Sequence, residues 1–135
     1  MSILIVEDNA GDITLLRTAL KAKRLDGEMT IIRDGESALA FADTVDSGLD
    51  TQCPRLVLLD LNLPKVNGRE ILKRFRTSVR LSAIPIVVLS SSSDERDKAI
   101  ALTLGATRYL QKPLDLTAFM DIGTVVETLL LESKP

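Results

Sequence analysis

The sequence predicts an α/β fold in which an open sheet of five parallel strands is covered by helices on both faces. Five short apolar, β-branched runs alternate along the chain with five segments of helical periodicity. The runs are nearly uninterrupted, which is typical of strands buried on both faces of a parallel sheet. The length of 135 residues suits one domain and is too short for an eight-stranded barrel. We therefore expect residues 1–135 to form a single (βα)₅ domain, doubly wound, with strand order 2-1-3-4-5.

Two strands and two helices are expected in the first half of the chain. Apolar residues are contiguous in the strands and recur every three or four positions in the helices, which predicts strands at 2–6 and 29–33 and helices at 13–20 and 38–45. Asp34 with Gly35 favours the start of the second helix. Residues 44–54 show no periodicity and are predicted to form a surface loop.

Three further strand and helix pairs follow by the same rules. The strands are expected at 56–60, 84–90 and 107–111, and the helices at 72–79, 100–104 and 116–130. Ser92 and Glu95 form a predicted capping box for the fourth helix, and Gly105 can end that helix. Asp115 is a predicted cap for the fifth helix.

The composition excludes several kinds of chemistry. The chain has no histidine and one cysteine, which excludes Ser-His-Asp and Cys-His catalysis, Cys/His zinc sites, histidine-ligated haem and an intrachain disulfide. No apolar stretch approaches the ~20 residues that span a bilayer, so we expect a cytoplasmic protein without a membrane partner. With 17 basic and 19 acidic residues, the chain is not expected to bind nucleic acid, and the arginines of residues 69–80 are interpreted as a solvated helix face.

Four strands of the predicted sheet end in residues that can carry chemistry together. Glu7 and Asp8 follow the first strand, Asp60 ends the third, Ser90 ends the fourth and Lys112 follows the fifth. The carboxyl ends of parallel strands meet at one sheet edge, where three carboxylates would repel one another without a cation. Hard oxygen ligands with room for water suit Mg²⁺. We therefore predict a Mg²⁺ site at which Asp60 attacks phosphorus to form an aspartyl phosphate.

Each of these residues also fits an ordinary structural role. Acidic residues at strand ends often cap the next helix, a serine hydroxyl often bonds the nearby backbone, and a lysine is usually a solvated surface amine. What favours the functional interpretation is their coincidence at one edge of one sheet.

Four segments of the chain carry a resemblance to a known family. They are residues 7–9 (EDN), 58–64 (LLDLNLP) with Gly68, 87–91 (VVLSS) and 109–113 (YLQKP). Ser90 lies 30 residues after Asp60, and Lys112 lies 52 residues after it. In these segments and spacings the chain resembles the receiver domain of two-component response regulators over residues 2 to about 131, a family with a flavodoxin-like fold.

The resemblance implies a role for each matching residue. Asp60 would be the phosphoacceptor, Asp8 and the Asn62 backbone carbonyl would be Mg²⁺ ligands, and Glu7 would assist through a metal-bound water. Lys112 would bind the phosphoryl group and precede a cis peptide bond to Pro113. Ser90 would be the switch hydroxyl and Tyr109 the switch aromatic, although an aromatic resting on the fourth helix from the edge strand explains Tyr109 equally well.

Two residues are predicted to set the lifetime of the phosphate. Asn62 and Ser92 lie two positions beyond Asp60 and Ser90. A small neutral Ser92 would leave the in-line path of an attacking water open, and the Asn62 amide could orient that water.

The resemblance also narrows the function. Residues 7–12 (EDNAGD), 61–65 (LNLPK) and 112–116 (KPLDL) are most similar to single-domain regulators that partner phytochrome-type histidine kinases. We therefore expect a stand-alone receiver without an output domain, which takes its phosphoryl group from a kinase phosphohistidine and passes a signal by protein contact or onward phosphotransfer. It would act on itself and not as a turnover enzyme. The alternatives are a Mg²⁺ phosphohydrolase with an aspartyl nucleophile and a pseudo-receiver that binds partners without phosphorylation.

The last helix predicts self-association. Leu116, Phe119, Met120, Val126 and Leu130 would face the sheet. A second apolar stripe would then remain uncovered and could pair with itself in a two-fold homodimer; its members are Ile122, Val125, Leu129 and Leu131.

Overall fold

The computed structural model describes residues 2–48 and 53–133 and has the predicted architecture. Five parallel strands form one sheet in the order β2-β1-β3-β4-β5, so the flavodoxin-like fold is confirmed. The strands are β1 (Ile3–Val6), β2 (Met29–Ile32), β3 (Leu56–Asp60), β4 (Ile86–Ser90) and β5 (Arg108–Gln111). The helices are α1 (Ala10–Ala22), α2 (Gly35–Asp46), α3 (Gly68–Thr77), α4 (Glu95–Thr103) and α5 (Leu116–Glu132).

The strand register brings the carboxyl ends of four strands to one edge. Val6 pairs with Leu59, Asp60 pairs with Leu89, and Ser90 pairs with Gln111. The residues that follow or end these strands therefore share that edge, as parallel pairing requires.

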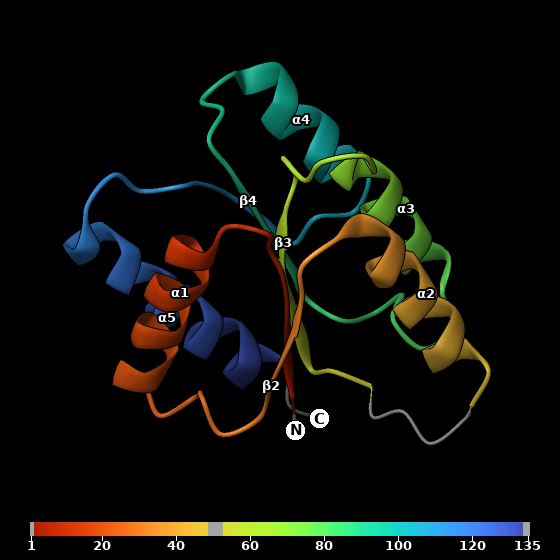
Figure 1. The fold of residues 1–135 in the computed structure, drawn as a ribbon, viewed down its shortest axis with the longest axis horizontal. Helices are drawn as coiled ribbons and strands as arrows, with labels where there is room; N and C mark the ends of the chain where they lie inside the picture. The colour runs from red at the N-terminus through yellow and green to blue at the C-terminus, as the bar shows by residue number, and fades with distance from the viewer. Residues whose placement is uncertain (1, 49–52, 134–135) are drawn as a thin grey trace.

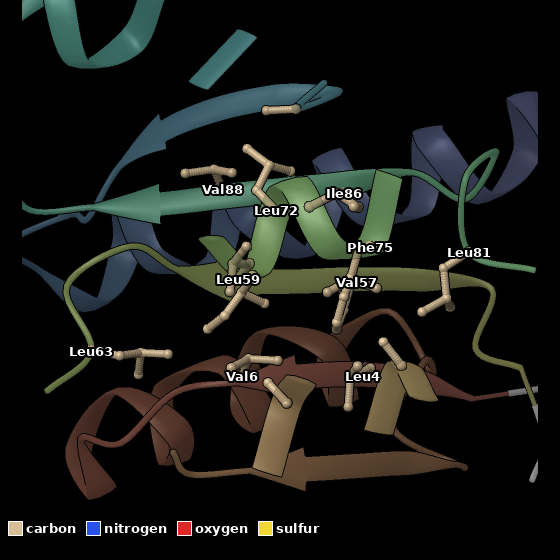
Figure 2. Close-up of a cluster of buried hydrophobic side chains, with 14 of the residues drawn as sticks. Leu4, Val6, Val57, Leu59, Leu63, Leu72, Phe75, Leu81, Ile86 and Val88 are labelled. Atoms are coloured by element: carbon tan, nitrogen blue, oxygen red, sulfur yellow. The ribbon is translucent and has the colours of Figure 1, made fainter. Parts of the chain in front are cut away.

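Two apolar clusters, one on each face, hold the helices to the sheet. In Figure 1, α1 and α5 lie on one side of the sheet, and α2 and α3 lie on the other. Successive strand residues alternate between the clusters: Leu58 packs with α1 and α5, whereas Val57 and Leu59 pack with α2 and α3. Figure 2 shows Leu72 and Phe75 of α3 over β3 and β4. Burial on both faces explains the uninterrupted apolar runs.

Of the four predicted capping signals, three are confirmed and one is wrong. Asp34 caps α2 and Asp115 caps α5, each by accepting a backbone N–H three residues on, at 2.7 and 2.8 Å. Gly105 follows α4 with a φ of 109°, which only glycine adopts readily. The capping box of Ser92 with Glu95 does not form, because Asp94 accepts the N–H of Arg96 and is itself the N-cap.

The third helix and the second loop differ from the prediction. α3 ends at Thr77, so Val79 lies beyond it and is 86% exposed, while Leu81 supplies the buried contact instead. α2 continues to Asp46, three residues into the predicted loop. Residues 49–52 of that loop lie outside the described part of the chain.

The prediction of two apolar faces on α5 is wrong. Ile122 and Leu129, assigned to the free stripe, are 2% and 4% exposed, whereas Leu116, assigned to the sheet, is 55% exposed. The helix packs against α1 as well as the sheet, which gives it a wider buried face. Gly123 permits this approach, because a Cβ there would lie 2.5 Å from the carbonyl oxygen of Ala19. The stripe proposed for a homodimer is therefore largely core.

The arginines of the α3 region make contacts within the molecule. Arg74 forms ion pairs with Asp43 and Asp46 at 2.8 and 2.9 Å, which join α3 to α2. Arg76 has a different role: its guanidinium donates to the carbonyls of Ile84 and Ser82, at 2.6 and 3.1 Å, and of Gly105 at 2.8 Å. Burial lowers the pKa of Arg76.

None of the helices in the described ranges has the length and apolar character needed to cross a bilayer.

Candidate functional site

The candidate site lies where β1 and β3 end. Glu7 continues β1 by donating its backbone N–H to Ile32 of β2 at 3.0 Å, and its side chain is buried. Asp60 is the last residue of β3 and is 2% exposed. The backbone N–H of Asn62 donates to Asp60 Oδ1 at 2.8 Å, which fixes the orientation of this carboxylate. The two buried carboxylates are thus held by the sheet backbone.

Three carboxylates converge at this edge. One oxygen from each of Glu7, Asp8 and Asp60 lies within 4.8 Å of the others. Carboxylates this close repel one another and favour either a bound cation or a shared proton. Burial, together with the neighbouring Asp60 carboxylate, raises the pKa of Glu7 to about 7. A bound cation would therefore relieve the electrostatic repulsion among the three carboxylates.

Lys112 supplies positive charge to the site. Its Nζ lies 2.7 Å from Glu7 Oε1, 2.8 Å from Asp12 Oδ2 and 3.2 Å from Asp60 Oδ2. Burial lowers the pKa of this amine, but its contacts with Asp12 and Glu7 raise it on balance. The ammonium therefore remains charged and is centred among three carboxylates.

Asp12 is one of two residues at the site that the sequence interpretation missed. It lies in the first turn of α1, where Asn9 caps the helix by accepting the Asp12 N–H at 2.9 Å. An acidic residue in a first turn is ordinarily explained by its favourable interaction with the helix dipole. This explanation gave no reason to expect a contact with Lys112, 100 residues later. Only its place three residues after the cap, at the same sheet edge, could have indicated the contact.

The carboxylate cluster fits a divalent metal ion. Glu7 Oε1 is buried and accepts no hydrogen bond from the described residues; Lys112 faces it as an ion-pair partner outside hydrogen-bond geometry. Glu7, Asp8 and Asp60 offer the hard oxygen ligands that such ions prefer. These three residues would hold the ion. The Asn62 carbonyl ligand stays a prediction.

Ser90 and Tyr109 belong to a hydrogen-bonded chain beside Asp60. Ser90 Oγ donates to Asn62 Oδ1 at 3.2 Å and accepts the N–H of Ser92 at 3.1 Å. The Tyr109 hydroxyl donates to the carbonyl of Ser92 at 2.8 Å. Ser92 therefore links the serine at the site to the aromatic residue of β5.

The series of hydrogen bonds that joins Ser90, Ser92 and Tyr109 continues to α3 and α4. Ser92 Oγ donates to Asp97 Oδ2 at 2.6 Å, and Asp97 forms an ion pair with Arg69 at 3.0 Å. Sequence reasoning did not single out Asp97, because an acid in the first turn of α4 is common. A pocket of about 600 Å³ lies beside this chain, with a lining that includes Asn62, Lys65, Arg69, Ser90 and Asp97.

The cis peptide bond expected between Lys112 and Pro113 is not present. All peptide bonds of the described residues are trans. The trans form is favoured even before proline, by about 0.5–1 kcal/mol. Lys112 reaches the carboxylates with this trans bond in place.

Comparisons with known proteins identify the family of the chain and agree with its fold. Residues 3–122 match the family described as the response regulator receiver domain. Response regulator Rcp1 of Synechocystis sp. is 37% identical over 131 residues, which are 97% of this chain and 89% of the relative.

Two solved structures share the fold across nearly the whole chain. The phosphorylated cyanobacterial phytochrome response regulator RcpA has a TM-score of 0.86 at 35% identity and covers 99% of this chain and 96% of its own. The Mn²⁺-bound form of Rcp1 has a TM-score of 0.84 at 36% identity, with the same coverage.

Proposed function

The chain belongs to the response regulator receiver domain family, and from this premise we propose that Asp60 accepts a phosphoryl group from a histidine kinase. The observation that carries the proposal is the position of Asp60. Its carboxylate is buried at the sheet edge, grouped with Glu7 and Asp8, and lies 3.2 Å from the Lys112 ammonium.

In the proposed reaction, an Asp60 carboxylate oxygen attacks phosphorus in line with the leaving group. A P–O bond to Asp60 forms as the P–N bond of a phosphohistidine breaks, and the imidazole leaves with the electron pair. Such transfers need positioning and neutralisation of the phosphoryl oxygens more than proton transfer. The Asn62 N–H holds one Asp60 oxygen, and Lys112 lies beside the other.

The metal ion proposed for this site is Mg²⁺. Held by Glu7, Asp8 and Asp60, it would neutralise the carboxylates and the incoming phosphoryl oxygens. Two features support the assignment: all ligands are oxygens, and the related Rcp1 is known in a Mn²⁺-bound form.

The proposed switch uses the hydrogen-bonded chain at Ser90. A phosphoryl group on Asp60 would offer the Ser90 hydroxyl a charge-assisted hydrogen bond in place of Asn62. Movement of Ser90 would disturb the Ser92 N–H that it now accepts, and with it the Ser92 carbonyl bonded to Tyr109. The surface formed by α4, β5 and α5 would change as a result.

The proposed partners follow from the family. A histidine kinase supplies the phosphoryl group, and relatives named as phytochrome and bacteriophytochrome regulators support a phytochrome-type kinase. The signal would leave through contact with a downstream protein or onward phosphotransfer. Asn62 and Ser92 keep their proposed role in the phosphate lifetime.

The test is intact-protein mass spectrometry after incubation with acetyl phosphate and Mg²⁺. Wild type should gain one phosphoryl group, and Asp60→Asn should not. Asp121→Asn, which changes an exposed aspartate of α5, controls for the loss of a charge. Phosphorylation of Asp60→Asn to the wild-type level would disprove the assignment. Sustained hydrolysis of a phosphomonoester over many turnovers would favour a phosphohydrolase instead.

A further inference from the structure

Among the described residues, Asp12 is the one ion-pair partner of the Lys112 ammonium that lies outside the carboxylate cluster. The Lys112 ammonium contacts three carboxylates, and two of them, Glu7 and Asp60, belong to the group that would hold a metal ion. Asp12 does not belong to that group, yet its contact of 2.8 Å is as short as a charge-assisted hydrogen bond. The sequence resemblance assigns no role to Asp12.

The position of Asp12 is fixed by the start of α1. Its backbone N–H bonds the side chain of Asn9, and it lies in the first helical turn. Its carboxylate therefore meets Lys112 from a helix, while the other two contacts come from β1 and β3. Asp12 is thus the partner of the ammonium that a metal ion would not share.

We propose that Asp12 is a positioning residue that competes with the phosphoryl group for Lys112 and so limits how tightly the site holds that group. The proposal rests on Asp60 being the phosphoacceptor. Glu7 and Asp60 confine Lys112 from two sides, at 2.7 and 3.2 Å, so the ammonium stays at the site when Asp12 is neutral. Neutralising Asp12 therefore mainly removes the competing charge.

The charges at the site predict that loss of the Asp12 charge has opposite effects on the binding of Mg²⁺ and of the phosphoryl group. When all are ionised, Glu7, Asp8, Asp12 and Asp60 carry four formal negative charges against the one positive charge of Lys112. Removing one negative charge weakens the attraction for a cation and lessens the repulsion of an anion. If Asp12 had a purely structural role, its replacement would instead weaken the binding of both ligands.

The experiment measures both ligands on the full chain. Isothermal titration calorimetry gives the Mg²⁺ dissociation constant, and ¹⁹F NMR at saturating Mg²⁺ gives the affinity for beryllofluoride, a stand-in for the phosphoryl group. For Asp12→Asn we expect Mg²⁺ to bind about three- to tenfold more weakly and beryllofluoride about three- to tenfold more tightly. Asp12→Ala, also uncharged, should give the same signs.

Two further variants separate charge from structure. Asp12→Glu restores the charge and should return both affinities toward wild type. Glu36→Gln removes an exposed acid from the first turn of α2 and should change neither affinity. Weaker or unchanged beryllofluoride binding by both uncharged variants would overturn the role of Asp12. Wild type that binds Mg²⁺ but no beryllofluoride, and stays unphosphorylated by acetyl phosphate, would overturn the proposed function as well.

Discussion

The metal-free protein is expected to lose stability as the pH rises through the range in which Glu7 ionises. Burial at the sheet edge, with Asp60 beside it, raises the pKa of Glu7 from 4.5 to about 7. Between these values the folded chain holds a proton that the unfolded chain has released. The free energy of unfolding therefore falls with rising pH in this window and levels off above about pH 7.

The size of the effect follows from the width of the window. It spans about 2.5 pH units, and each unit corresponds to about 1.4 kcal/mol, so the loss reaches about 3–4 kcal/mol. A domain of this size is commonly stable by about 5–15 kcal/mol, which makes such a change readily measurable.

Other carboxyls act in the opposite sense, at lower pH. Hydrogen bonds lower their pKa values below the usual 3.8: Asp34 with Ser37, Asp46 with Ser78 and Asp94 with Arg96. They contribute stability that is present above pH 3.8 and is lost as the pH falls below it. Measurements from about pH 5 to about pH 8 therefore isolate Glu7.

The assay is urea unfolding in the presence of a chelator across this range. Wild type should become less stable toward the alkaline end, and Glu7→Gln, which cannot ionise, should show a much smaller slope. Glu132→Gln, at an exposed glutamate of α5, should follow wild type. Saturating Mg²⁺ should flatten the wild-type profile, because the ion favours ionised Glu7. Equal slopes for wild type and Glu7→Gln in chelator would refute the reasoning.

Four other outcomes are expected. Lys112→Ala should slow phosphorylation by acetyl phosphate without weakening Mg²⁺ binding, because the ammonium stabilises phosphoryl oxygens but opposes the metal; weaker Mg²⁺ binding in calorimetry would contradict this. Beryllofluoride should shift the NMR signals of Tyr109, and bound beryllofluoride with unaltered signals would exclude the switch. Ser92→Leu should change the rate of phosphate loss, followed by mass spectrometry, and an unchanged rate would remove this residue from the account. Gly123→Ala should lower the free energy of unfolding, because overpacking against α1 costs about 1–3 kcal/mol and outweighs a helix-propensity gain of about 1 kcal/mol; greater stability in urea would contradict the close approach.

The strands and their edge were predictable because their signal is local. An uninterrupted run such as residues 56–60 reports burial on both faces, and parallel strands can meet at one edge only in a few orders. The cluster of Glu7, Asp8 and Asp60 follows directly from that topology. The sequence was therefore sufficient to predict the strands and the sheet edge, because residues close together in the sequence determine them.

The failures concern contacts that helical periodicity and capping patterns do not report. The buried face of α5 depends on α1, which touches it where Gly123 meets Ala19, and helical periodicity alone does not report a second packing partner. Asp12 was missed because its partner Lys112 is 100 residues away. At the start of α4, Ser92 and Asp94 are both good caps, and the bond from Ser92 to Asp97 decides between them.

α4 is tethered to α3 at both ends, and the two tethers differ in kind. Near its start, Asp97 pairs with Arg69 and also accepts from Ser92, so this tether adjoins the candidate site. Beyond the end of α4, the Arg76 guanidinium donates to the main-chain carbonyl of Gly105. This contact does not depend on a side chain at residue 105. If the first tether loosened while the second held, α4 would pivot about Gly105, so that the displacement would be largest at the start of the helix beside the candidate site and would fall toward its end.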